Sequence, residues 1–78
     1  MSTMTYKGFE IEAAPSRLRS GEWTVKVHIS IKRDGNTLSR TCDALDTFPT
    51  REEATHYCFD FGKKVIDGQV KEFSLDDL

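Results

Sequence analysis

Two histidines and two cysteines are the side chains of this sequence best suited to metal binding or nucleophilic chemistry: His28, Cys42, His56 and Cys58. A structural zinc site needs ligands in closely spaced pairs, and the spacing here offers none. In the strands and helix predicted below, both cysteines face the interior and both histidines face solvent. We therefore expect no metal site and no cofactor.

His56 has acidic neighbours at helical spacing, since Glu52 and Asp60 lie four residues before and after it. This is the spacing of ordinary ion pairs on an exposed helix surface. A cysteine nucleophile needs a base within hydrogen-bond reach, whereas Cys58 is expected to point into the core. The five glycines are scattered and form no phosphate-binding loop. We therefore expect no catalytic residues and no enzymatic activity.

A second group of residues suggests binding instead of catalysis. Six basic side chains lie on the polar face of one predicted strand or near its ends: Arg17, Arg19, Lys26, His28, Lys32 and Arg33. Such a face could lie against nucleic acid, with lysine and arginine on phosphates. Glu10 and Glu12 share this face and would repel phosphate, and the chain has a net charge of −2. Nucleic-acid binding is therefore the alternative hypothesis.

Apolar side chains on the flank of the predicted helix suggest a protein interface. Phe59 and Ile66 lie about 120–140° around the helix from Ala54, which is expected to face the sheet. Phe73, in the C-terminal tail, would extend the same surface, and exposed aromatic side chains mark interaction sites. Alternatively, the tail covers this flank within the chain. We favour a module that acts through a protein partner or in regulation.

The composition is that of one small globular domain. The chain has 78 residues, of which 37% are hydrophobic and 31% charged, a balance typical of soluble proteins. No apolar run approaches the ~18 residues that span a membrane, and no signal peptide is recognisable. We expect a cytoplasmic monomer or weak homodimer with a folded core over residues 5–68 and loose tails at 1–4 and 71–78.

The clearest strand is predicted over residues 23–31, where apolar and polar residues alternate strictly. Asp34-Gly35 then predicts a two-residue hairpin turn. The expected pairs are Ile31 with Leu38, Val27 with Cys42, Val25 with Ala44 and Lys26 with Asp43. This register places Arg40 opposite Ile29 on the apolar face, for which the sequence suggests no reason.

A helix is predicted over residues 51–67. Thr50 is a good N-cap, and Glu53 is placed to complete a capping box. Gly68 can end the helix because it adopts left-handed backbone angles at no steric cost. A further strand is predicted over residues 6–13. The predicted fold is therefore α+β, a three-stranded antiparallel meander with one C-terminal helix packed across its apolar face.

Several short motifs resemble small, largely uncharacterised bacterial proteins labelled HlyU-like, and together they cover most of the chain. These motifs are Tyr6-Lys7-Gly8-Phe9-Glu10-Ile11, Pro15, Gly21-Glu22-Trp23, Arg51-Glu52-Glu53-Ala54, Val65-Ile66-Asp67-Gly68-Gln69 and Phe73. Some members of that family are named as transcriptional activators. The resemblance therefore implies a bacterial protein with a regulatory role.

The predicted order of three strands and a helix also resembles two sheet-type DNA-binding domains, those of plant ethylene-response factors and the arm-binding domain of phage-type integrases. The similar segments are Tyr6-Lys7-Gly8-Phe9, Gly21-Glu22-Trp23-Thr24-Val25-Lys26-Val27 and Thr47-Phe48-Pro49-Thr50-Arg51-Glu52-Glu53-Ala54. In those families the exposed sheet enters the major groove, which implies DNA binding here. Where those families carry arginines, this sequence has Glu10, Glu12, Lys26 and His28.

Overall fold

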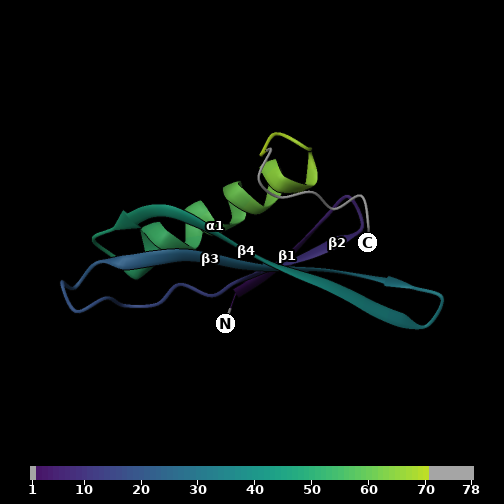
Figure 1. The fold of residues 1–78 in the computed structure, drawn as a ribbon, viewed down its shortest axis with the longest axis horizontal. Helices are drawn as coiled ribbons and strands as arrows, with labels where there is room; N and C mark the ends of the chain where they lie inside the picture. The colour runs from purple at the N-terminus through teal and green to yellow at the C-terminus, as the bar shows by residue number, and fades with distance from the viewer. Residues whose placement is uncertain (1, 71–78) are drawn as a thin grey trace.

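The computed structural model describes residues 2–70, which form an antiparallel sheet with a helix lying across one face (Figure 1). The elements are β1 (Ser2–Tyr6), β2 (Phe9–Ala13), β3 (Trp23–Arg33), β4 (Asn36–Phe48) and α1 (Arg51–Ile66). The strands lie in the sheet in chain order, each antiparallel to the next. The structure confirms the predicted α+β class and C-terminal helix. No helix in the described range is long and apolar enough to cross a membrane.

The predicted number of strands is wrong, because the sheet has four strands and not three. The start of the chain is a hairpin in which Lys7 and Gly8 join β1 to β2 with φ angles of 50° and 85°. Two successive positive φ values define a type I′ turn, which normally carries Asn or Asp before the glycine. Because lysine occupies that position, the turn was not recognised from the sequence. Residues that were expected to form a loose end and one long strand instead form two paired strands.

The β3–β4 hairpin has the predicted register. The pairs include Ile31 with Leu38, Val27 with Cys42, Val25 with Ala44 and Lys26 with Asp43. Asp34 and Gly35 form the turn, with φ angles of 51° and 81°. Arg40 does lie opposite Ile29 and is half-buried. The strict alternation of apolar side chains along β3 therefore fixed the pairing of its neighbour, as expected from the two-residue period of a strand.

α1 begins at the predicted residue and ends one residue earlier than expected. Thr50 Oγ1 accepts a hydrogen bond from the Glu53 amide at 3.2 Å. At the other end, Gly68 has a φ of 75°, and the Gly68 and Gln69 amides donate to the Val65 and Lys64 carbonyls. This pair of bonds is a Schellman motif, which satisfies carbonyls that the last helical turn leaves open.

The hydrophobic core lies between α1 and the sheet. Its buried side chains are Ile11, Ala13, Val25, Val27, Ile29, Cys42, Ala54, Cys58, Phe61 and Val65. Both cysteines are free thiols, and burial raises the pKa of each. Gly62 is also buried and faces Ile11, where a Cβ atom would lie only 2.8 Å from Ile11 Cγ2. The helix therefore approaches β2 this closely because Gly62 has no side chain.

Candidate functional site

The six basic residues predicted to contact nucleic acid do not gather in one place. Arg17 and Arg19 belong to the β2–β3 loop at one end of the molecule, whereas Lys32 and Arg33 lie beside the β3–β4 turn at the other end (Figure 1). The long axis measures 42 Å. The structure therefore separates the loop arginines from the basic residues of the hairpin tip.

Lys26 and His28, which lie between these ends, have polar neighbours on the adjacent strands. Lys26 is opposite Asp43 on β4. His28 is opposite Glu12 on β2, and its Nδ1 lies 2.9 Å from Thr41 Oγ1. This face of the sheet therefore carries both signs of charge. Nucleic-acid binding stays a prediction, and the arrangement of these residues adds nothing to it.

The helix flank predicted as a protein interface is partly covered by the strand that the sequence did not reveal. Phe59 and Ile66 are half-buried and pack against the core. α1 contacts β1 on this side, and Phe59 lines the same cleft as Ser2. Phe73, the third residue of the predicted interface, lies outside the described residues.

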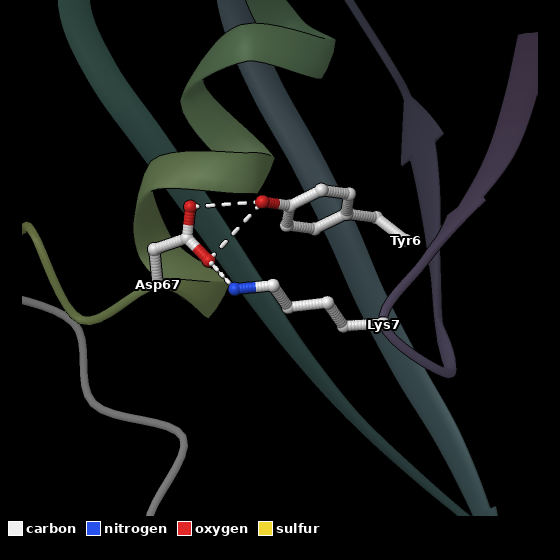
Figure 2. A network of polar contacts seen from close by, with 3 residues as sticks. All are labelled: Tyr6, Lys7 and Asp67. Atoms are coloured by element: carbon white, nitrogen blue, oxygen red, sulfur yellow. Dashed lines mark hydrogen bonds and ion pairs between the residues drawn. The ribbon is translucent and has the colours of Figure 1, made fainter.

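A cluster of polar contacts connects the β1–β2 turn to the end of α1 (Figure 2). Tyr6 donates its phenolic hydrogen to Asp67 Oδ2 at 2.9 Å, and Lys7 Nζ donates to Asp67 Oδ1 at 2.5 Å. Lys63 Nζ lies 5.8 Å from the centre of the Tyr6 ring, within the range of a cation–π interaction. The bonds from Lys7 and Tyr6 lower the pKa of Asp67, and the bond to Asp67 raises the pKa of Lys7.

We expect the contribution of Asp67 to stability to disappear in acid. Because folding lowers its pKa below the ordinary value of 3.8, the stabilisation is complete above that value and is lost as pH falls through the folded-state pKa. The difference in unfolding free energy between wild type and Asp67→Asn should be constant between about pH 5 and 9 and should shrink below about pH 4.

Urea unfolding of both proteins across this pH range measures that difference. Asp60→Asn, on the exposed part of α1, is the control for loss of a carboxylate whose ion-pair contact, with His56 Nε2 at 3.7 Å, is longer. A difference for Asp67→Asn that stays constant into acid would contradict the assigned ion pair.

The other flank of α1, which faces β4, carries an apolar surface that sequence reasoning missed. Leu45 is fully exposed. It and Asp46 are extra residues in β4, because Ala44 pairs with Val25 and the next pair joins Thr47 to Thr24. Such a bulge interrupts the ladder and redirects side chains. The sequence does contain one sign of this bulge. Ala44 and Leu45 are consecutive apolar residues, which breaks the alternation of apolar and polar residues along β4.

Leu45 borders a recess of about 480 Å³ between β4 and α1. A second hollow of about 500 Å³ adjoins it through Tyr57, whose ring centre lies 5.0 Å from that of Phe48. We call the two hollows together the β4–α1 groove. Its apolar lining comprises Ala44, Leu45, Phe48, Tyr57, Phe61 and Val70.

The rim of the β4–α1 groove is mainly acidic. Its carboxylates are Asp43, Asp46, Glu52 and Glu53, and its cationic side chain is Lys64, with His56 beside the second hollow. Tyr57 donates a hydrogen bond to Asp46 Oδ2 at 2.9 Å. This bond, then burial, then the negative charges of Asp46 and Asp60 raise the pKa of Tyr57. The groove therefore combines an apolar floor with a negative potential.

One wall of the groove is a strand with a free edge. β4 is the last strand of the sheet and pairs only with β3 within the described part of the chain. The outer edge of such a strand presents backbone N–H and C=O groups that can pair with another chain. The free edge, the exposed Leu45 and the apolar recess therefore occur side by side.

The described residues define a small sheet-and-helix domain with a mixed-charge sheet face and an apolar groove along a free strand edge. The chain belongs to the family described as Domain of unknown function (DUF6566), whose model matches residues 1–76. No curated protein and no solved structure matches the chain. The resemblances to HlyU-like proteins and to sheet-type DNA-binding domains stay predictions.

Proposed function

We propose that this protein is a non-enzymatic protein-interaction module whose partner binds in the β4–α1 groove. The observation that carries this proposal is the full exposure of Leu45 beside the apolar recess. A single exposed leucine is ordinary on a protein surface. Here it adjoins Tyr57 and Val70, which are themselves half-buried, so the exposed apolar area is continuous.

The geometry of the groove fits a partner that supplies an extended segment. Addition of a strand to an open sheet edge is a common mode of peptide recognition, in which main-chain hydrogen bonds give affinity and side-chain pockets give specificity. β4 offers the edge and the recess offers the pocket. Complete burial of a leucine side chain contributes about 1.5–3 kcal/mol, which corresponds to at least a tenfold change in affinity.

This proposal extends the sequence-based hypothesis of a protein partner but moves the interface to the other flank of the helix. Phe59 and Ile66 are half-buried against the core, whereas Leu45 is fully exposed. A regulatory role, which the resemblance to HlyU-like proteins implies, would be exercised through the partner that this groove binds.

Selection of peptides from a random library displayed on phage, with the full chain as target, tests the proposed function. We expect the enriched peptides to bind Leu45→Ser at least tenfold more weakly than wild type, since Leu45 would be buried in the complex. Leu18→Ser is the matched control, because Leu18 is also exposed but lies in the β2–β3 loop.

The proposal fails if no peptide is enriched, or if the enriched peptides bind Leu45→Ser as tightly as wild type. Equal weakening by Leu18→Ser and Leu45→Ser would also contradict it, because the effect would then not be specific to the groove.

A further inference from the structure

We infer that the segment bound in the β4–α1 groove is extended and basic, with lysine or arginine alternating with large aliphatic residues. This inference rests on the proposed function and names the chemistry of its partner. Three observations support it. They are the charges around the groove, the two-residue period of a paired strand, and the poorer fit of two other possible occupants, a second copy of the chain and its own C-terminal residues.

The charge of the groove selects a cationic partner. Asp43 and Asp46 lie on the strand side, and Glu52 and Glu53 lie on the helix side. Lys64 is the cationic side chain among them. Asp43 is exposed on the polar sheet face opposite Lys26, while Asp46 reaches Tyr57 across the groove. Carboxylates therefore lie on both sides of any segment placed along this edge.

The period of a strand determines which partner residues meet these groups. Successive side chains of a paired strand point to opposite faces of the sheet. On the helix side, the alternate residues of a bound segment would meet the recess floored by Tyr57 and Phe61, which suits aliphatic side chains. On the polar side the residue next to Asp43 would meet its carboxylate, which suits lysine or arginine. The β4 ladder is interrupted after Ala44 and resumes at Thr47, so main-chain pairing of the bound segment should be interrupted at the same place.

A second copy of this chain is a poorer occupant. Pairing of two β4 edges would bring the carboxylates of one groove toward those of the other, and like charges in neighbouring strand positions are destabilising. Residues 71–78, which lie outside the described part of the chain, have one lysine against Glu72, Asp76 and Asp77. Their sequence is acidic and therefore does not complement the rim.

The test is an NMR titration of the full ¹⁵N-labelled chain with two synthetic heptapeptides, both acetylated and amidated. One alternates leucine with lysine, and the other alternates leucine with glutamate. We expect the leucine–lysine peptide to shift the amide signals of Asp43, Leu45 and Tyr57 and to bind at least tenfold more tightly than the leucine–glutamate peptide. Its affinity should fall as salt is added, because exposed charges are screened.

Three variants separate the contributions to binding, and a fourth is the control. Asp43→Asn and Glu53→Gln should each weaken the leucine–lysine peptide severalfold while reducing its salt dependence. Leu45→Ser should weaken it at low and at high salt alike, because the contact that it removes is apolar. Leu18→Ser should leave the affinity unchanged.

Each alternative outcome has a definite meaning. Equal or tighter binding of the leucine–glutamate peptide at Leu45 would overturn the basic partner but retain the groove as a binding site. Signals of Asp43 and Leu45 that move with protein concentration alone would identify a second copy as the occupant and overturn the inference. Failure of both peptides to shift these signals would also overturn it, and the library selection would then decide whether the groove binds any peptide.

Discussion

Gly62→Ala should destabilise the protein by up to about 2 kcal/mol, although alanine is favoured over glycine in helices by about 1 kcal/mol. The reason is the contact between α1 and β2. A Cβ atom on residue 62 would lie 2.8 Å from Ile11 Cγ2 and 3.0 Å from Ile11 Cδ1. Ile11 is completely buried, so it has little freedom to move away. Overpacking of a core typically costs about 1–3 kcal/mol, which outweighs the gain in helix propensity.

A double-mutant cycle with Ile11→Ala checks the assigned cause. Ile11→Ala alone should cost about 2–5 kcal/mol, because it leaves a cavity in the core. It also removes the side-chain atoms that crowd residue 62. In that background Gly62→Ala should therefore be stabilising, by up to about 1 kcal/mol. Urea unfolding of the four proteins measures both effects. If Gly62→Ala changes the unfolding free energy in the same direction in both backgrounds, the close approach of α1 to β2 is not the reason that glycine is needed.

Tyr6→Ala should cost about 2 kcal/mol, less than the 3–5 kcal/mol typical of a fully buried aromatic residue. Tyr6 is half-buried, and its ring packs against the core. It also bonds to Asp67 at the end of α1. Loss of the ring would therefore loosen β1 from the helix as well as remove apolar contact.

Tyr6→Phe is the control, because it removes the hydroxyl group and keeps the ring. It should cost about 1 kcal/mol or less, since the lost bond is solvent-exposed. Urea unfolding gives the two free energies, and amide hydrogen exchange shows where the structure opens. We expect Tyr6→Ala to accelerate exchange in β1 and β2 more than in β3. Uniform acceleration throughout the sheet would show that Tyr6 supports the whole domain and not the attachment of β1.

The parts of the fold that were predicted correctly are those in which several local signals agree. Alternation along β3, the Asp34-Gly35 turn and the Thr50 cap each specify a conformation from neighbouring residues alone. β1 was missed because the Lys7-Gly8 turn lacks the usual residue before glycine, and because Ser2 and Thr3 carry no apolar pattern. Its stability comes partly from Tyr6 and Asp67, which are distant in the sequence.

The candidate groove could be predicted from the sequence only in part. The acidic residues and Tyr57 are visible in the sequence, but their proximity depends on how α1 crosses the sheet. The exposure of Leu45 depends on the bulge in β4. The sequence indicates this bulge only through the break in the alternating pattern at Ala44-Leu45. The flank containing Phe59 and Ile66 was expected either to be exposed or to be covered by the C-terminal tail, because the strand beside it was not foreseen.

The contact between Tyr6 and Asp67 joins residues 61 positions apart, and this separation affects how the chain can fold during synthesis. The two hairpins are local structures that can form as soon as their residues leave the ribosome. Contacts that close long loops form later, because the entropy of loop closure must first be overcome. We therefore expect β1 and β2 to gain their final stability only after α1 has been synthesised to its end. A ribosome-bound chain that stops before residue 67 should remain sensitive to proteases.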